Sequence, residues 1–376
     1  MPDTTHIPET IQIIEPTLMT ETGHCYSFLT SLCNASNKTP LCLWINRNAS
    51  VAFTGENVQV KRYFYSKLRR FQCYGLYKKL LANNGKLFIS TAGLTDLVLL
   101  NWASKEKISK GKVYLYFHWL NSSEKKIARL RKIARKQPNL VILGPTPSVI
   151  KTFRETGFEN VRIVPYPISV QTQHGKTKHN SFTGLLYAGA ARQDKGISDV
   201  VNLVEYMNRL GLQIPFRLQN SPDHRGKYDE ITKAEIQRLE KIPYPHLRLF
   251  PETLKQDEYA ELFAGAICVQ LYNADLFADR ISGVTLDALS AGSPIVATSG
   301  TWTARMVQRF DAGKIIDSTG PEKTLSAIQE IISDYPRYSK NAYAAGLVLQ
   351  HENSAEILFN TLTELPGQLS HGFTSG

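Results

Sequence analysis

The amino-acid sequence lacks the features of secreted, zinc-binding and membrane-spanning proteins. Its five cysteines, at positions 25, 33, 42, 73 and 268, form no CxxC pair and no Cys/His set with zinc-ligand spacing, which argues against a disulfide framework and a structural zinc. No run of about 18 apolar residues occurs, so no transmembrane helix is expected. The first residues carry Asp3 and Glu9, where a secretory signal needs positive charge. We therefore expect a cytoplasmic protein with reduced thiols.

The remaining composition is that of an ordinary globular protein, but its charge is unevenly distributed. With 42% hydrophobic and 20% charged residues, the 376-residue chain is long enough for two domains. Residues 1–166 contain 24 Lys and Arg against 10 Asp and Glu, a net charge of +14, whereas residues 167–376 carry −3. This segregation indicates that the first half faces an anionic partner: phospholipid headgroups, a phosphorylated acceptor or nucleic acid.

Short apolar runs alternate with helix-length amphipathic segments along the whole chain. The predicted strands lie at residues 11–16, 41–45, 86–90, 112–117, 140–144 and 161–165 in the first half, and at 184–190, 214–219, 247–250, 266–272, 293–298 and 313–317 in the second. Alternating strands and helices are typical of parallel sheets covered by helices. The predicted fold class is therefore α/β, with two parallel sheets.

A polar segment between the two series of strands, residues 168–183, predicts a linker. It separates a basic amino-terminal domain, residues 1–167, from a carboxyl-terminal domain, residues 184–350. Residues 351–376 are predicted to form a helix and tail, with a return to the first domain as one option. Because ligands of open α/β sheets bind beyond the carboxyl ends of the strands, we expect two Rossmann-like domains facing an interdomain cleft.

A turn rich in small residues, YAGAARQDKG at 187–196, follows the first predicted strand of the second domain. Gly189 would let a ligand approach the backbone, while Arg192 and Lys195 supply two cations, so a phosphate would fit here. The sequence contains neither GxxxxGK[ST] nor GxGxxG. The alternative, an exposed basic turn without a ligand, therefore stays open.

A second candidate site for an anion lies within residues 274–298. Ser282 and Gly283 precede a short predicted helix, VTLDALSA, which ends before Gly292. Backbone N–H groups at the start of a helix attract anions, and a glycine allows close approach. The amides of Ser282, Gly283 and Val284 are therefore predicted to bind a diphosphate.

Two carboxylates flank this helix start. Asp279 lies in the preceding loop and Asp287 lies in the second turn of the helix. A carboxylate can accept hydrogen bonds from two hydroxyl groups, which suits a sugar or a ribose. Alternatively, Asp279 pairs with Arg280 or another surface cation, and Asp287 points into solvent.

The segments YAGAARQDKG and DRISGVTLDALSAGSPIVATSG, with LRLFPETLKQDEYAELFAGAICVQLY between them, resemble the carboxyl-terminal domain of GT-B glycosyltransferases, which have two Rossmann domains. Within that architecture they most resemble the retaining family 4 type, over residues 184–350. The resemblance implies that Arg192 and Lys195 hold the diphosphate of a nucleotide-sugar donor. The Glu-x7-Glu signature of the family maps onto Asp279, which would contact the transferred sugar, and Asp287, which would contact the ribose.

Two features differ from the pattern of that family. Arg192 and Lys195 are only three residues apart, closer than usual, and both signature glutamates are aspartates, which are one methylene shorter. No Asp-x-Asp motif occurs, so the metal-dependent single-domain class of glycosyltransferases finds no support. Neither a metal nor a cofactor other than the nucleotide-sugar substrate is predicted.

Two histidines of the first domain are candidates for the reacting centre. His24 follows Gly23 in the loop after the first predicted strand, and His118 follows the strand at 112–117. In inverting GT-B relatives a histidine in a Gly-His loop is the general base, and the resemblance maps this role onto His24. In retaining relatives a histidine after the later strand lines the sugar and acceptor site, which corresponds to His118. Either histidine could instead be a packing or capping residue.

Two segments carry much of the positive charge of the first half. Residues 61–81 interleave six aromatic with seven basic residues, and residues 124–136 place Ile127, Leu130 and Ala134 on one face of an otherwise basic helix. Basic amphipathic helices with aromatic residues suit an anionic membrane surface, which would present a lipid-linked acceptor. Alternatively, both are cover helices whose apolar residues face the sheet and whose cations face water.

Together these patterns favour a glycosyltransferase that moves a sugar from a nucleotide-diphosphate sugar to a hydroxyl acceptor, such as a lipid-linked or surface-polysaccharide glycan. We expect it to be retaining, metal-independent and cytoplasmic, with peripheral contact on the inner face of the plasma membrane. No nucleic acid is expected as a partner. The alternatives are a non-catalytic relative that binds RNA or anionic glycans, an inverting enzyme with His24 as base, and a nucleotide-sugar epimerase.

Overall fold

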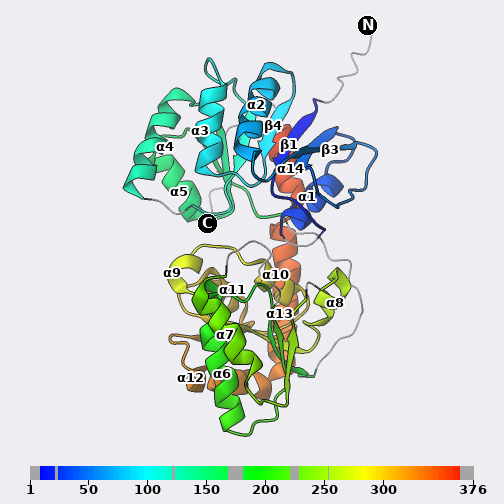
Figure 1. Cartoon of the computed structure of the whole chain (residues 1–376), viewed down its shortest axis with the longest axis vertical. Coiled ribbons are helices and arrows are strands. Elements are labelled where there is room, and N and C mark those ends of the chain that lie inside the picture. The colour runs from blue at the N-terminus through cyan, green and yellow to red at the C-terminus, as the bar shows by residue number, and fades with distance from the viewer. Residues whose placement is uncertain are drawn as a thin grey trace. The chain divides into compact units, whose positions relative to one another are not determined.

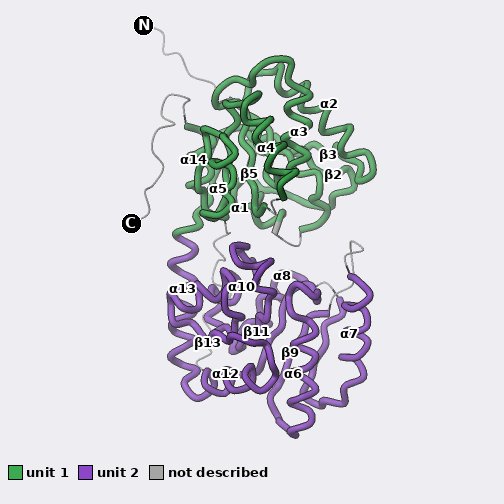
Figure 2. The backbone as a smooth tube through the Cα atoms, turned by 90° about the vertical axis from the view of Figure 1, so that its left-hand side faces the viewer, with its two compact units in different colours: residues 1–170, 352–376 green, residues 171–351 purple. Residues whose placement is uncertain are grey.

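The computed structural model describes residues 9–21, 24–120, 123–167, 181–220, 228–252 and 254–364. The chain divides into two compact units, unit 1 with residues 1–170 and 352–376, and unit 2 with residues 171–351 (Figure 2). Each unit is built around one sheet whose described strands all run parallel (Figure 1). Helices connect most of the successive strands, but none of the described helices lies between β2 and β3. The predicted α/β class with two parallel sheets is confirmed.

The sheet of unit 1 has seven strands in the order β3-β2-β1-β4-β5-β6-β7. These are β1 (Ile11–Glu15), β2 (Leu41–Asn46), β3 (Val58–Phe64), β4 (Lys86–Ile89), β5 (Val113–Tyr116), β6 (Val141–Gly144) and β7 (Asn160–Ile163). The strand order reverses between β1 and β4, which makes their carboxyl ends the switch point where ligands of such sheets bind. The register, with Ile14 opposite Ile89, places Glu15 beside Ser90 at this point.

Helices cover both faces of this sheet. The helices are α1 (His24–Ala35), α2 (Arg69–Ala82), α3 (Leu94–Ala103), α4 (Glu124–Lys136), α5 (Pro147–Glu155) and α14 (Ala355–Thr363). Helices α2 to α5 bury apolar residues against one face, among them Leu76, Leu97 and Leu130. On the other face, the ring of Phe28 in α1 packs 5.2 Å from that of Tyr116, and α14 lies beside α1.

The carboxyl-terminal helix α14 is tied to unit 1 by polar contacts as well as by packing. Lys86 Nζ donates hydrogen bonds to the carbonyls of Leu362 (2.7 Å) and Glu364 (2.9 Å). Arg162 pairs with the Glu364 carboxylate at 2.6 Å. A lysine at a helix end compensates the unpaired carbonyls of the last turn. The chain therefore leaves unit 1 after β7, forms unit 2, and comes back through α14.

The structure corrects the interpretation of residues 61–81 as one basic helix. Residues 61–64 complete strand β3, and the helix α2 begins only at Arg69. The bonding of β3 to β2 uses the backbone of this segment, and Phe64 is fully buried in the core. The missed strand is an edge strand of polar, alternating sequence (VQVKRYF), which gives a weak apolar signal.

The sheet of unit 2 has six strands in the order β10-β9-β8-β11-β12-β13. The strands are β8 (Gly184–Tyr187), β9 (Phe216–Gln219), β10 (Leu247–Phe250), β11 (Ala266–Gln270), β12 (Ile295–Thr298) and β13 (Gly313–Ile316). The helices are the 3-10 turn η1 (Gln193–Lys195), α6 (Ile197–Arg209), α7 (Glu230–Glu240), α8 (Gln256–Glu261), α9 (Ala274–Phe277), α10 (Gly283–Ser290), α11 (Trp302–Phe310), α12 (Pro321–Ser333) and α13 (Tyr335–Glu352), of which the last two follow the final strand. Helices α6, α7 and α12 share one apolar core with the sheet.

The switch point of this second sheet lies between β8 and β11. The loop after β8 contains η1, and the loops after β11 contain α9 and lead to α10. The backbone N–H of Asn273, after β11, donates to the carbonyl of Asp194 in η1 at 3.1 Å, which joins the two loops. The two sequence segments singled out above therefore meet at the edge of the sheet where a ligand is expected.

Candidate functional site

The turn of small residues after β8, residues 187–196, lies directly against the start of α10. Gly189 has φ +87°, a backbone conformation that favours glycine, and its N–H donates to Gln219 Oε1 at 2.7 Å. A Cβ built on Gly189 would lie 3.0 Å from Lys195 Nζ and 3.2 Å from Val284 Cγ2. Three residues predicted for diphosphate binding, 95 positions apart at the extremes, therefore adjoin one another.

The start of α10 has the features of an anion-binding helix end. Ser282 is the N-cap, and its Oγ accepts a hydrogen bond from the Thr285 N–H at 3.3 Å. Gly283 is exposed, with no atom within 4 Å of the place where a Cβ would stand. The helix is anchored to strand β11, because the buried Thr285 hydroxyl donates to Gln270 Oε1 at 2.6 Å. The first-turn amides thus occupy a fixed position beside an open approach.

Lys195 supplies a desolvated cation to this site. It is half-buried, and its Nζ lies 5.7 Å from the ring centroid of Tyr272. Burial, with the neighbouring Arg192 charge, lowers the pKa of Lys195 to about 8. The ammonium is charged at pH 7 but poorly solvated, which favours its pairing with a ligand anion.

Arg192 is engaged by a carboxylate two residues further on. Asp194 accepts hydrogen bonds from Arg192 Nε (2.8 Å) and Nη2 (2.7 Å), and its Oδ2 lies 3.5 Å from Arg280 Nη1. Burial lowers the pKa of Arg280, with a further contribution from the Arg192 charge. Sequence reasoning did not include Arg280 or Asp194 in the site. Their proximity to Asp279 and Lys195 in the sequence was the available signal.

Asp287 faces the site rather than solvent. It is half-buried, and its Oδ2 accepts a hydrogen bond from the Tyr259 hydroxyl of α8 at 3.1 Å. Burial raises the pKa of Asp287 to about 6, and both the Tyr259 hydrogen bond and the Lys195 charge oppose this rise. The alternative of a solvent-directed carboxylate is therefore wrong for Asp287.

Asp279, by contrast, forms an ion pair with a surface cation. Its Oδ1 lies 2.6 Å from Arg305 Nη2, and the two side chains are 30% and 47% exposed, respectively. This is the alternative arrangement considered from the sequence, with Arg305 as the cation. Asp279 lies in the loop between α9 and α10, three residues before Ser282.

His118 lies at the carboxyl end of β5 in unit 1, within an aromatic setting. Its ring packs against those of Phe28, Tyr116 and Tyr166, with centroids 5.0 to 5.5 Å apart. Its Nε2 is 2.8 Å from the carbonyl oxygen of Ser90. Because a carbonyl can only accept, Nε2 carries a hydrogen and donates, which makes Nδ1 the acceptor nitrogen of the neutral ring.

A buried carboxylate stands behind His118. Glu15, at the end of β1, is 1% exposed and accepts hydrogen bonds from the hydroxyls of Ser90 (2.8 Å) and Thr91 (2.5 Å) and from Thr17. Thr91 Oγ1 also lies 3.5 Å from His118 Nε2. The sequence alone did not reveal this cluster. It is created by the parallel pairing of β4 with both β1 and β5.

The second histidine candidate is placed only by its backbone. His24 is the first residue of α1, in the loop region after β1, but its side chain lies outside the described part of the structure. Among the described residues, no group of three or more His, Cys, Asp or Glu is placed to hold a metal ion. No helix in the described ranges is both long and apolar enough to cross a membrane.

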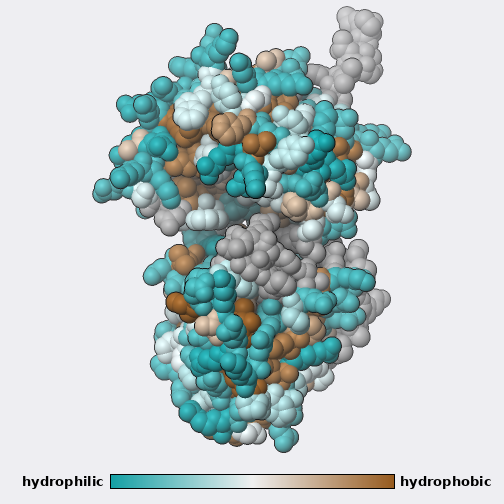
Figure 3. Space-filling model, in the orientation of Figure 1, coloured by the Kyte–Doolittle hydropathy of each residue, from teal (hydrophilic) through white to brown (hydrophobic). Residues whose placement is uncertain are grey.

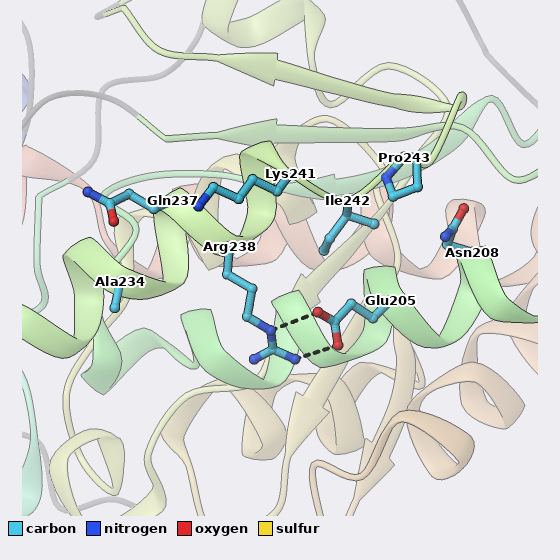
Figure 4. A pocket seen from close by; sticks show the side chains of 8 residues that line it. All are labelled: Glu205, Asn208, Ala234, Gln237, Arg238, Lys241, Ile242 and Pro243. Carbon is cyan, nitrogen blue, oxygen red and sulfur yellow. Dashed lines mark hydrogen bonds and ion pairs between the residues drawn. The ribbon is translucent and has the colours of Figure 1, made fainter.

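A groove of about 540 Å³ lies between α6 and α7, apart from these residues (Figure 4). Arg238, the arginine among the described residues that line this groove, makes paired hydrogen bonds with Glu205 at 2.7 and 2.5 Å and a third with Asn202 at 2.8 Å. A guanidinium already satisfied by a carboxylate has little left for an anionic ligand. None of the predicted site residues lines the groove among the residues the structure describes. We therefore place the candidate site at the carboxyl ends of β8 and β11.

Comparison with known proteins shows the fold through structure rather than sequence. No protein-family model and no curated protein sequence matches the chain. Among solved structures, sucrose-phosphate synthase from Thermosynechococcus elongatus has a TM-score of 0.67 at 12% identity, covering 93% of this chain and 96% of that one. Anabaena HepE in complex with UDP-glucose has a TM-score of 0.68 at 12% identity, covering 94% and 98%.

A third neighbour is WaaG, a glycosyltransferase involved in lipopolysaccharide biosynthesis, with a TM-score of 0.65 at 12% identity over 93% of this chain and 98% of its own. The likeness in each case covers nearly the full length of both chains. The protein therefore has the fold of GT-B glycosyltransferases, with two Rossmann-like units.

Proposed function

We propose that the protein is a glycosyltransferase that moves a sugar from a nucleotide-diphosphate sugar to a hydroxyl acceptor. The observation that carries this proposal is the meeting of Gly189, Lys195 and the first turn of α10 at the switch point of unit 2. A desolvated cation, free helix amides and a backbone open to close approach suit a diphosphate. One neighbour with this fold, HepE, was solved with UDP-glucose and with UDP, which supports a nucleotide-sugar donor.

Each site residue has a distinct role in this proposal. Arg192, Lys195 and the amides of residues 282–284 bind the diphosphate, while Gly189 lets it approach the backbone. Asp287 accepts a hydrogen bond from the ribose, with Tyr259 already orienting its carboxylate. Asp279 accepts a hydrogen bond from a hydroxyl of the transferred sugar. To do so, its carboxylate must share its contact with Arg305 or give it up.

Catalysis in this arrangement is mainly electrostatic. The acceptor oxygen forms a bond to the anomeric carbon as the bond from that carbon to the diphosphate breaks, and negative charge develops on the leaving group. Lys195, Arg192 and the α10 amides stabilise that charge. We propose retention of configuration, in which the leaving phosphate takes the proton of the acceptor hydroxyl. His118, with Nδ1 as its acceptor nitrogen, would line the sugar and acceptor site.

We further propose that transfer needs no divalent metal, because the cations and amides of the site supply the positive charge. The experiment is to incubate the protein with UDP-, GDP- and ADP-sugars and to follow both hydrolysis and transfer, with and without EDTA. Proton NMR of the product then reports the anomeric configuration. Inversion would transfer the role of general base to His24. Absence of both binding and turnover with every donor would refute the proposal.

The acceptor proposed for this site is a lipid-linked or surface-polysaccharide glycan presented at the inner face of the plasma membrane. Helix α2 carries Phe71 at 80% exposure and Leu68, just before it, at 53%. Helix α4 buries Leu130 and leaves its basic residues exposed, among them Lys125, Lys126, Arg129 and Arg131. Figure 3 shows apolar side chains exposed between hydrophilic ones on the visible face of unit 1. The role of WaaG in lipopolysaccharide biosynthesis is in line with such an acceptor.

A further inference from the structure

The most unusual feature of the candidate donor site is a carboxylate placed among its cations. Asp194 stands in the turn η1 between Arg192 and Lys195 in the sequence. It forms a bidentate pair with Arg192 at 2.7 and 2.8 Å and lies 3.5 Å from Arg280. Two guanidinium groups from different loops, one after β8 and one after β11, therefore converge on one anion.

A guanidinium binds carboxylate and phosphate through the same paired N–H groups. The Nε and Nη2 donors of Arg192 are the ones that Asp194 occupies. A diphosphate held by Arg192 in the same bidentate way must therefore replace this carboxylate or share its donors. Arg280 reaches the same anion from the opposite loop, so it would contact whatever anion takes that position.

The backbone of the turn is fixed, which leaves the side chain of Asp194 as the mobile part. The carbonyl of Asp194 accepts a hydrogen bond from the Asn273 N–H at 3.1 Å. The turn ends at Gly196 with φ +77°, where a Cβ would lie 2.1 Å from the Leu271 carbonyl oxygen. The carboxylate can thus leave the arginines by rotation about its side-chain bonds without displacement of η1.

We infer that Asp194 competes with the donor diphosphate for Arg192 and Arg280, and that Arg280 is a third diphosphate-binding cation. This inference rests on the proposed function of the site. The physical reason is that three cations and a helix end that stabilise the leaving diphosphate would also retain the nucleoside diphosphate product. When the Asp194 carboxylate pairs again with Arg192 and Arg280, it weakens the complex with the product and promotes its release.

The test measures anion affinity by isothermal titration at pH 7.5 with pyrophosphate, UDP, GDP, ADP and uridine. The Asp194→Asn variant keeps the size of the side chain and removes its charge, and we expect it to bind pyrophosphate and the nucleoside diphosphate about tenfold more tightly. The Arg280→Gln variant should bind both about tenfold more weakly. Affinity for uridine, which has no phosphate, should stay unchanged in either variant.

The control is Glu230→Gln, which removes one negative charge from an exposed position of unit 2. Glu230 is 89% exposed and pairs with Lys233 at 2.7 Å. This variant should leave all affinities as in the wild type, whereas a general charge effect would shift them as Asp194→Asn does. Thermal unfolding of each variant verifies that the fold is retained.

Steady-state kinetics give a second readout. If Asp194 promotes product release, Asp194→Asn should lower kcat and strengthen inhibition by the nucleoside diphosphate by the same factor as its binding. Weaker or unchanged pyrophosphate binding in Asp194→Asn would overturn the inference and assign Asp194 to holding Arg192 in place. If the wild type binds pyrophosphate but no nucleoside diphosphate, the proposed glycosyl transfer fails, and the pyrophosphate titrations still decide the competition.

Discussion

Replacement of Lys195 by methionine should weaken nucleoside diphosphate binding about ten- to a hundredfold. The magnitude follows from one charge-assisted contact, worth roughly 1.5–3 kcal/mol. The structure favours this range because Lys195 Nζ lies against Gly189 and the start of α10 and is already partly removed from water. Isothermal titration with the nucleoside diphosphate of the accepted donor measures the change.

The wild-type affinity should also depend on pH in a defined direction. Burial lowers the pKa of Lys195 to about 8 in the absence of ligand, and a bound diphosphate favours the charged form and so raises the pKa. Binding should therefore weaken above pH 8, by up to about tenfold per pH unit, until the pKa of the complex is passed. The Lys195→Arg variant, which stays charged, should lose this weakening between pH 8 and pH 9.5.

Protein stability separates this effect from a loss of structure. Removal of a charge that is partly desolvated should leave the melting temperature of Lys195→Met equal to that of the wild type or higher. The reasoning would be refuted by an unchanged dissociation constant in a folded Lys195→Met variant. A wild-type affinity that is flat from pH 7 to pH 9.5 would equally contradict it.

Four further predictions concern other residues. Asp287→Asn should weaken nucleotide binding about fivefold. Because burial raises the pKa of Asp287 to about 6, affinity for the nucleotide should fall below pH 6 more steeply in the wild type than in this variant in titrations. Asp279→Asn should lower kcat while nucleoside diphosphate affinity stays constant in steady-state and titration experiments. Glu15→Gln should lower the free energy of unfolding by about 1–3 kcal/mol in urea denaturation, because it disturbs the buried hydrogen bonds from Ser90 and Thr91. Replacement of Lys125, Lys126, Arg129 and Arg131 by Gln should weaken co-sedimentation with anionic vesicles at low salt and leave hydrolysis of a soluble donor unchanged. If the wild-type protein does not bind such vesicles, the proposed membrane contact is refuted.

Local sequence signals were sufficient for most of the fold. The buried strands of parallel sheets are short continuous apolar runs, and each of the twelve predicted runs overlaps a strand of the structure. The helix α10 was recognisable because two local signals mark its ends: the N-cap Ser282 at its start and Gly292 just after its last turn. The strand β3 was missed because it lies at the edge of the sheet, where polar residues alternate with apolar ones.

The candidate donor site was predictable in its residues but not in its charge balance. Gly189 and Lys195 could be named from the turn at 187–196, and Val284 from the helix start after Gly283. The pairing of Arg192 with Asp194, and the approach of Arg280 to the same carboxylate, depend on how the loops after β8 and β11 meet. Long-range contacts of this kind leave no periodic signal in the sequence. The same reason explains why Glu15 and Thr91 were not connected with His118.

The basic surface of unit 1 shows how one sequence pattern can serve two purposes. Of the aromatic residues in 61–81, Phe64 and Tyr77 are fully buried, whereas Phe71 is 80% exposed and Tyr65 is 43% exposed. Phe64, in strand β3, and Tyr77, in helix α2, are therefore accounted for by their place in the core of unit 1. Core packing does not explain Phe71 and Tyr65, nor Tyr74, which is 39% exposed. The guanidinium of Arg47 stands 5.0 Å from the Tyr65 ring. Core packing therefore explains part of the aromatic content of this segment, and only the exposed remainder supports the proposed contact with an anionic membrane.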